Sequence, residues 1–250
     1  MQKPKSLSIC FPCYNDAGTI GTLVATASAV VSRLTEDYEI IVVNDGSSDT
    51  SAQVLEELQK RYRDLKVVHH AVNQGYGATL RDAFQHATKE WIFYTDGDGQ
   101  YDVWELTKLV AQVHEGVDIV NGYKIARQDP FYRIFIGHAY NWINKLLFGL
   151  RIRDIDCDFR LFRRAILDKI TLTSTGGEIC VELIQQCEAL GLSYAEVSVS
   201  HYHRVVGRSQ FFHPANIVHC LRGLLQLWWN LVWCPKTKNI KNWITEIARS

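Results

Sequence analysis

The sequence has no long apolar run, no start that resembles a signal peptide and no excess of one charge. No stretch reaches the roughly 18 apolar residues that a membrane-spanning helix needs, so we expect no transmembrane helix. Lys3 and Lys5 lead directly into a strand-like run, which is not typical of a signal peptide. Lys and Arg number 27 and Asp and Glu number 27, and this zero net charge argues against nucleic acid as a partner.

The seven cysteines form no disulfide framework and no pair of metal-binding motifs. They are scattered and odd in number, so we expect a reducing, cytoplasmic location. Cys10 and Cys13 do form a C-x-x-C, but Cys10 falls in an expected strand. A redox or zinc role needs this motif at a helix start or together with a second pair of ligands. We therefore interpret both as small buried residues.

A linker rich in Pro, Gly or Ser and an internal repeat are also missing. The composition, with 47% hydrophobic and 22% charged residues, is that of an ordinary globular domain. The charges are unevenly placed: residues 1–120 carry 10 Lys and Arg against 17 Asp and Glu, and residues 121–250 carry 17 against 10. An acidic first half suits a cation site, and a basic second half suits phosphates or an anionic membrane surface.

Short apolar runs alternate with helical patterns. We expect strands at 7–11, 39–43, 65–69, 91–95, 117–121 and 194–200, and helices at 20–34, 51–62, 75–87, 104–114, 131–148, 178–190 and 215–232. This alternation predicts an α/β fold with a mostly parallel sheet covered by helices on both faces. Ligands bind at the carboxyl ends of the strands in such sheets, where the polar clusters 14–16, 44–45, 73–75 and 96–98 fall.

The sharpest signal is Asp96-Gly97-Asp98-Gly99-Gln100, which follows an apolar strand. Two carboxylates two residues apart can share Mg²⁺ or Mn²⁺, which prefer oxygen ligands and leave places for diphosphate oxygens. Surface turns also carry D-x-D, but the position at a strand end favours a metal site. Asp45, at the end of another strand, is a candidate to accept hydrogen bonds from a base or ribose. The alternative there is an Asx turn, with Asp49 capping the next helix.

Two later segments carry further candidates. Asp154, Asp156 and Asp158 alternate along one segment, as ligands or as a solvated face paired with neighbouring arginines. Arg204 could bind a diphosphate as a bidentate fork. His201 and His203 precede it and would either complete a metal shell or have a structural role.

Residues 215–232 form a helix with a wide apolar face, Trp residues at its end and Lys residues after it. This pattern fits a helix that lies in a membrane interface. A helix packed on the protein's own core produces the same pattern. We therefore divide the chain into a domain at 1–212 and an amphipathic helical tail at 213–250, with both interpretations open for the tail.

The ordered motifs SICFPCYND (8–16), VVNDGSSDT (42–50), NQGYGA (73–78) and DGDGQ (96–100) together resemble glycosyltransferase family 2, whose nucleotide-sugar-binding fold is called GT-A. The segments DCDFR (156–160) and RVVGRSQ (204–210) are closest to the branch of polyprenyl-phosphate sugar synthases, such as dolichyl-phosphate mannose synthase. The resemblance spans residues 7 to 212, and the ordered set is far more specific than any one motif.

The resemblance implies a role for each matching position. The base and ribose pocket of the donor would be lined by Pro12, Tyr14, Asp16, Val43 and Asp45. The metal would be held by Asp96, Asp98 and Gln100, and the donor diphosphate by Arg204. The acceptor phosphate would be bound by Lys124, Arg127 and Arg133. Catalysis would rest on Asp98, Asp158 and Arg204.

These roles predict an inverting enzyme that transfers a hexose from a UDP- or GDP-linked sugar to a polyprenyl phosphate, with Mg²⁺ or Mn²⁺ as cofactor. It would be peripheral on the cytoplasmic face of a membrane, held there by its own helix or by a membrane-anchoring partner protein. One rival is transfer to a hydroxyl group, with Asp156, Asp158 or Glu178 as the base. Another is a non-catalytic nucleotide-binding subunit. A dehydrogenase is disfavoured because no G-x-G-x-x-G follows the first strand.

Overall fold

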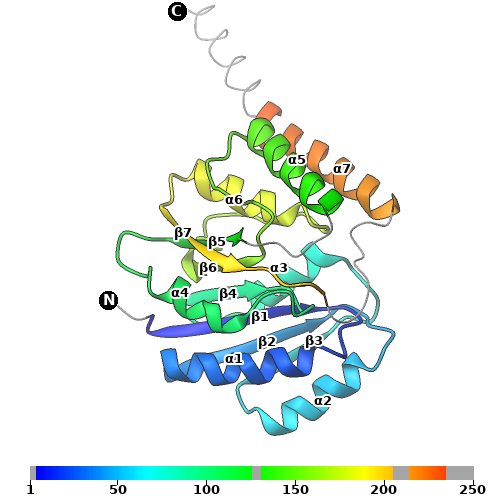
Figure 1. Cartoon of the computed structure of the whole chain (residues 1–250), viewed down its shortest axis with the longest axis vertical. Helices are drawn as coiled ribbons and strands as arrows, with labels where there is room; N and C mark the ends of the chain where they lie inside the picture. Colours follow the sequence, from blue (N-terminus) through cyan, green and yellow to red (C-terminus); the bar gives the residue numbers. More distant parts are fainter. Residues whose placement is uncertain (1–3, 126–130, 205–213, 235–250) are drawn as a thin grey trace, which may run out of the picture.

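The computed structural model describes residues 4–125, 131–204 and 214–234, without the side chains of 131–133 and 214–216. Its centre is one seven-stranded sheet with the strand order β3-β2-β1-β4-β6-β5-β7 (Figure 1). Neighbouring strands run parallel except β6, which is antiparallel to both β4 and β5. The strands are β1 (Ser6–Cys13), β2 (Asp37–Asn44), β3 (Leu65–His69), β4 (Trp91–Thr95), β5 (Ile119–Ile125), β6 (Phe159–Arg163) and β7 (Tyr194–Ser200).

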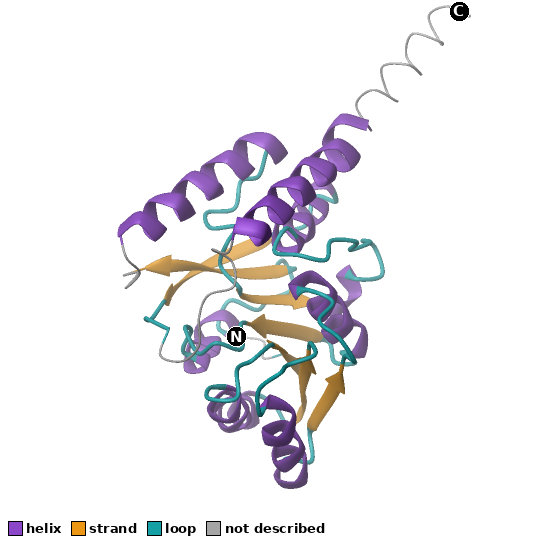
Figure 2. Cartoon of the chain, turned by 90° about the vertical axis from the view of Figure 1, so that its right-hand side faces the viewer, coloured by secondary structure: helices purple, strands orange, loops and turns teal. Residues whose placement is uncertain are grey.

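Helices cover both faces of this sheet, so the α/β fold predicted from the alternating pattern is confirmed (Figures 1 and 2). Alternate residues of one strand serve opposite faces, as the two-residue period of a strand requires. In β2, Ile40 and Val42 join the core cluster that includes α1 and α4, while Ile41 and Val43 join the cluster that includes α3 and α6. The helices are α1 (Ile20–Leu34), α2 (Ser51–Arg61), α3 (Tyr76–His86), α4 (Leu106–Val110), α5 (Phe131–Phe148), α6 (Ile179–Ala189) and α7 (Pro214–Trp228).

The element around residues 104–114 is shorter than the sequence pattern predicts. A 3₁₀ turn, η1 (Val103–Glu105), precedes the five-residue α4. After α4 the chain turns, and Arg163 of β6 donates hydrogen bonds to the carbonyl oxygens of His114 and Val117 in the segment that leads to β5. β5 also begins later and ends later than expected, because its pairing with β7 continues to Ile125.

The tail helix α7 packs on the protein. Cys220, Leu224 and Leu227 are buried in a third apolar cluster with residues of α6 and the end of α5. Trp228 donates its indole N–H to the carbonyl oxygen of Leu147 in α5 at 3.0 Å. One side of α7 is therefore core, and the helix continues as a π-helical turn, η3 (Trp229–Trp233). Within the part of the chain that is described, no helix has the length and apolar character to cross a membrane.

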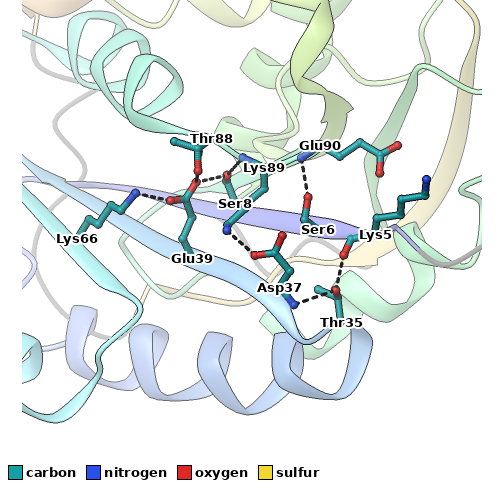
Figure 3. Close-up of polar contacts among 10 residues, drawn as sticks. All are labelled: Lys5, Ser6, Ser8, Thr35, Asp37, Glu39, Lys66, Thr88, Lys89 and Glu90. Carbon is teal, nitrogen blue, oxygen red and sulfur yellow. Dashed lines mark hydrogen bonds and ion pairs between the residues drawn. The ribbon is translucent and has the colours of Figure 1, made fainter.

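The edge of the sheet at the amino end of β1 and β2 is closed by a polar network (Figure 3). The carboxylate of Glu39 is 3% exposed and accepts hydrogen bonds from Ser8, Lys66 and Thr88. Burial by itself would raise the pKa of Glu39, but these hydrogen bonds outweigh it and lower the pKa below its usual value. Glu39 therefore holds this end of the sheet together, and its oxygens are fully used inside the protein.

Arg160 of β6 is fully buried and bonds to neutral acceptors. Its guanidinium donates to Asn121 Oδ1 and to the Tyr94 hydroxyl, both at 2.6 Å, and to the carbonyl oxygens of Ile155 and Cys157. Arg160 therefore does not take part in a solvated face with the neighbouring aspartates, which was one of the two alternatives for this segment. Arg160 instead fixes the backbone of the 154–158 segment from inside.

We predict that Arg160→Met destabilises the protein by about 3 kcal/mol or more, because it leaves several buried acceptors without a donor. Arg163→Met, in the same strand, is the matched control. Arg163 is partly exposed, with a 3.3 Å ion pair to Glu90 and two hydrogen bonds to backbone carbonyl oxygens, so its loss should cost about 1 to 2 kcal/mol. Urea unfolding of both variants measures the difference, and equal losses would contradict this role for Arg160.

Candidate active site

The loops that follow β1, β2 and β4 meet at the carboxyl edge of the sheet, as the sequence predicted. Asp45 N donates to the carbonyl oxygen of Cys13 at 2.9 Å, and Thr19 donates its hydroxyl to the carbonyl oxygen of Gly97 at 2.7 Å. A Cβ on Gly97 would lie 2.3 Å from the Pro12 carbonyl oxygen and 3.3 Å from Asp16 Oδ2. Only glycine allows the loop after β4 to come this close to the loop after β1.

Asp96 lies at the carboxyl edge of the sheet, close to polar side chains from α3, from α6 and from the segment before β6. The hydroxyl of Tyr76, the first residue of α3, donates to Asp96 Oδ1 at 2.7 Å. The thiol of Cys180 in α6 donates to Asp158 Oδ1 at 2.8 Å. Burial, and then the charges of Asp158 and Asp98, raise the pKa of Asp96 well above its ordinary value. Burial, and then the charge of Asp156, raise the pKa of Asp158.

Asp98 faces the guanidinium of Arg204. Arg204 Nη2 lies 3.0 Å from Asp98 Oδ2 and 3.9 Å from Asp16 Oδ1. Burial raises the pKa of Asp16 to about 6, partly countered by the Tyr14 N–H and by Arg204. Arg204 Nε is buried and finds no hydrogen-bond partner among the described residues. An N–H donor beside a group of carboxylates is suited to an anion that arrives together with a cation.

The negative charge around Asp96 and Asp98 suits a divalent cation, although the protein alone does not supply a complete set of metal ligands there. Among residues 4–125, 131–204 and 214–234, no three His, Cys, Asp or Glu side chains are grouped as a metal site would require. Asp96 and Asp98 nevertheless stand beside Asp16 and Asp158: the charge of Asp98 raises the pKa values of Asp16 and Asp96, and the charge of Asp158 raises the pKa of Asp96. Mg²⁺ is usually held by one or two carboxylates, with phosphates and water completing the shell. Asp96 and Asp98 match that pattern.

Gln100 and His201 tie the end of β7 to this loop. Gln100 donates its side-chain N–H to the carbonyl oxygen of Tyr202 at 2.9 Å, and Tyr202 N donates to the Gln100 carbonyl at 2.8 Å. A metal contact from Gln100 would therefore use its amide oxygen. The His201 ring packs edge-on against Tyr101, with centroids 5.0 Å apart, which favours the structural alternative for this histidine.

Asp45 has its hydrogen-bond partners within the protein. Its carboxylate is 3% exposed and accepts hydrogen bonds from the backbone N–H groups of Gln74 and Gly75 at 2.8 and 2.9 Å. His70 Nδ1 lies 2.7 Å from the same carboxylate, and His70 Nε2 lies 2.8 Å from Asp82. Both oxygens thus hold the loop before α3, and a direct contact of Asp45 with a base or ribose stays a prediction.

Lys124 also has its partners within the protein. Its side chain is 4% exposed, and Nζ contacts the backbone oxygen of Asp156 and lies 3.1 Å from Asp156 Oδ2. The structure therefore places the Lys124 ammonium against Asp156, and its contact with an acceptor phosphate stays a prediction. Arg127 lies outside the described residues, and Arg133 stands in the first turn of α5 with its side chain outside them.

The residues expected around the base divide into two kinds. Val43 is 0% exposed in the apolar cluster under α3, and Pro12 is buried within β1, so neither side chain lines a pocket; both strands are covered on both faces. Tyr14 is 36% exposed at the edge and Asp16 faces Arg204, so these two remain at the site.

Asn15 is a site residue that the sequence did not reveal. Its φ of 57° is uncommon for a residue with a side chain and marks local strain. Its Oδ1 accepts the N–H groups of Ser48 and Asp49 at 2.8 and 3.2 Å. Asp49 in turn accepts from the N–H of Ser51, the first residue of α2, at 2.9 Å, although the N-cap position that was expected for Asp49 is occupied by Thr50. Asn15 thus joins the loops after β1 and β2, a contact between distant segments that no local pattern signals.

Two glycines allow the start of α3 to press against residues 174–176. A Cβ on Gly75 would lie 2.5 Å from the Thr175 carbonyl oxygen, and one on Gly77 would lie 2.6 Å from that of Ser174. The Gly77 N–H also donates to the Thr175 carbonyl at 2.8 Å. This close approach places Tyr76, between the two glycines, where its hydroxyl reaches Asp96.

Comparison with known proteins agrees with this geometry. The model of the family described as Glycosyl transferase family 2 matches residues 8–171. Among solved structures, glucosyl-3-phosphoglycerate synthase from Mycobacterium tuberculosis, in complex with Mn²⁺, UDP and glucosyl-3-phosphoglycerate, superposes with a TM-score of 0.69 at 18% identity. The match covers 89% of this chain and 80% of that one.

The same synthase with Mn²⁺, UDP-glucose and phosphoglyceric acid gives a TM-score of 0.69 at 18% identity, over 90% of this chain and 80% of that chain. A crystal structure described only as a mycobacterial protein gives 0.69 at 19% identity, over 89% and 74%. At such identities these similarities establish the fold alone, which is the GT-A-like fold that the motifs implied.

We predict that Gly77→Ala destabilises the protein by about 2 kcal/mol, because three backbone atoms within 2.8 Å of the new Cβ must move. Gly21→Ala in α1 is the matched control: its Cβ would meet only Val54 Cγ1, at 3.8 Å, and should be neutral or stabilising by about 0.5 kcal/mol. Thermal unfolding distinguishes them, and a neutral Gly77→Ala would contradict the close packing.

His70 should make stability depend on pH. Burial would lower its pKa, but the hydrogen bonds with Asp45 and Asp82 outweigh it and raise the pKa above 6.5. The stabilisation from protonated His70 is therefore complete below 6.5 and is lost as pH rises through the higher folded pKa. His70→Gln should lack this decline, whereas the exposed His138→Gln should keep it. Unfolding temperatures between about pH 6 and pH 9 measure it; parallel curves for all three proteins would disprove it.

Proposed function

The chain belongs to glycosyltransferase family 2, and from that premise we propose that it transfers a hexose, with inversion, from a UDP- or GDP-linked sugar to a polyprenyl phosphate. The observation that carries the proposal is the contact between Arg204 and Asp98 at the carboxyl edge of the sheet, next to Asp96. Carboxylates for a cation and a guanidinium for a diphosphate stand together there, which is what a nucleotide-diphosphate donor requires.

Each residue of the group has a distinct task toward the donor. Asp96 and Asp98, with the amide oxygen of Gln100, would hold Mg²⁺ or Mn²⁺. When bound, the cation neutralises the charge that grows on the leaving nucleotide diphosphate. Arg204 would leave Asp98 and bind the negatively charged diphosphate. Its Nε, which has no hydrogen-bond partner among the described residues, could donate to the same anion. Tyr76 keeps Asp96 in place through its 2.7 Å hydrogen bond, and Tyr14 and Asp16 would border the nucleoside.

The polyprenyl phosphate acceptor is supported by its chemistry and by the surface of the protein. A phosphate monoester is anionic at neutral pH, so positioning and charge stabilisation supply most of the catalysis without a strong base. The basic second half of the chain suits that anion, and α5 and α7 expose apolar side chains suited to a lipid. Arg127 and Arg133 remain the proposed phosphate ligands.

Transfer to a hydroxyl group of a glycan, lipid or protein is the second candidate, and Asp158 favours it. A hydroxyl acceptor needs a base, and a carboxylate whose pKa is raised by burial suits that task. The two alternatives are less suited: Asp156 is paired with Lys124, and Glu178 is 4% exposed. Asp158→Asn would then abolish transfer while donor binding is retained; loss of donor binding as well would exclude Asp158 as the base.

The test of the main proposal is sugar transfer by the purified full chain, with Mn²⁺ or Mg²⁺, a panel of UDP- and GDP-sugars and a short polyprenyl phosphate. We expect metal-dependent formation of a lipid-phosphate sugar and a loss of about a hundredfold or more in Asp98→Asn, because the substitution removes a charge from the cation site. Asp102→Asn is the matched control, since Asp102 only accepts the N–H of Trp104 at the start of η1.

Each alternative outcome selects another function. Donor binding or hydrolysis without a lipid product would keep the transferase and move the acceptor to a hydroxyl compound. Neither donor binding nor turnover, in a folded protein, would favour the non-catalytic subunit. Equal losses in Asp98→Asn and Asp102→Asn would mean that the effect is not specific to the cation site.

A further inference from the structure

Large apolar side chains are exposed along α5. Phe135, Trp142 and Leu146 are 67%, 65% and 70% exposed. Their spacing of seven and four residues places them on one stripe of the helix. Ile136 and Ile143, which are also exposed, flank this stripe. A soluble domain seldom leaves so much apolar surface uncovered along one helix.

α7 and the π turn after it carry a second exposed stripe. Val218, Leu221, Leu225, Trp229 and Trp233 follow one another at intervals of three and four residues, and all are exposed. The buried residues of the same helix, Cys220, Leu224 and Leu227, are on another side. The helix is therefore apolar on the side that packs on the protein and also on a side that nothing in the described chain covers. We call the two stripes together the α5/α7 surface.

The α5/α7 surface lies at one end of the molecule, on the outer side of α6 (Figures 1 and 2). It is connected to the active site through α7. A Cβ on Gly223 of α7 would lie 2.7 Å from Glu178 Cδ, and Glu178 Oε1 accepts the N–H of Gly176 at 3.1 Å. Residues 174–176 in turn contact the start of α3. The surface is therefore linked by direct contacts to residues 174–176, which press against the start of α3 and so against Tyr76, the partner of Asp96.

The charges of these helices distinguish one occupant from another. Neither α5 nor the segment of α7 and η3 contains an Asp or Glu, while Arg133, Lys145 and Arg222 are basic. The sequence after residue 234 adds Lys236, Lys238, Lys241 and Arg249 against Glu246. Two copies facing each other through this surface would bring like charges together without acidic partners. Anionic lipid headgroups supply the missing negative charge, and Trp residues favour the membrane interface.

We propose that the α5/α7 surface docks onto the surface of a lipid bilayer that contains anionic lipids. The two helices would lie in the interface with their apolar stripes among the acyl chains and their basic side chains at the headgroups. This inference deepens the proposed function, because a polyprenyl phosphate acceptor is dissolved in such a bilayer. The sequence pattern suggested only α7 as an interfacial helix. We add α5, so that both apolar stripes contribute to membrane binding.

The test is flotation of the purified full chain with vesicles of phosphatidylcholine alone or with about 30% phosphatidylglycerol. We expect binding to the anionic vesicles that weakens with salt. The double variant Leu146→Glu/Leu225→Glu should bind on the order of a hundredfold more weakly, because each leucine contributes about tenfold to partitioning. Leu190→Glu is the matched control, since Leu190 is 47% exposed after the end of α6, away from both stripes.

Several results would overturn the proposal. These are no vesicle binding by the wild-type chain, equal binding by the double variant, or a wild-type dimer that the double variant converts to a monomer. Sedimentation equilibrium detects the dimer, which would mean that a second copy covers the surface. Donor binding should be unchanged in every variant. Vesicle binding without transfer of sugar to polyprenyl phosphate would support membrane docking and exclude polyprenyl phosphate as the acceptor. A failure of the docking proposal can therefore be told apart from a failure of the proposed function.

Discussion

The burial of several carboxylates side by side at the carboxyl edge of the sheet is the constraint around which the site is built. Burial, and after it the charges of neighbouring carboxylates, raise the pKa values of Asp16, Asp96 and Asp158, so negative charge here is unfavourable in the folded state. Hydrogen bonds from Tyr76 and Cys180 and the guanidinium of Arg204 hold it in place. Such a site has the most to gain from a cation, and an anionic donor that arrives with the cation restores the charge balance.

The sequence was sufficient for the fold and for the location of the site, because both follow from periodicity and strand ends. It failed where the answer depends on a neighbouring strand. Val43 ends β2, a strand covered on both faces, so its side chain is in the core. Lys124 was assigned to the acceptor phosphate by the family resemblance alone; in the structure β5 continues to Ile125 through its pairing with β7, and the Lys124 ammonium lies beside Asp156. Asp45 was identified as important, but its partners Gln74 and Gly75 could be found only in the structure.

The last helix shows a different limit of sequence patterns. An apolar pattern that is too wide for one interface left core packing and membrane contact equally possible for residues 215–232. In the structure, one side of α7 is packed and another is exposed: Leu224 packs against α6, and Leu225, one position further around the helix, is exposed. The pattern was therefore correct about the amount of apolar surface. It could not show which apolar residues of α7 are buried and which are exposed, because the positions of α5 and α6 decide which side is covered.

The bond between Gln100 and Tyr202 has a consequence for how the protein is made. These residues are 102 positions apart, and Arg204 follows β7, the strand at the far edge of the sheet. During synthesis, the acidic loop leaves the ribosome on the order of 5 to 20 seconds before the arginine that faces it. In the meantime the nascent chain holds the carboxylates without that counter-charge. A chain cut short before Arg204 would contain β1 to β4 and both aspartates of the acidic loop but would lack the guanidinium that faces Asp98.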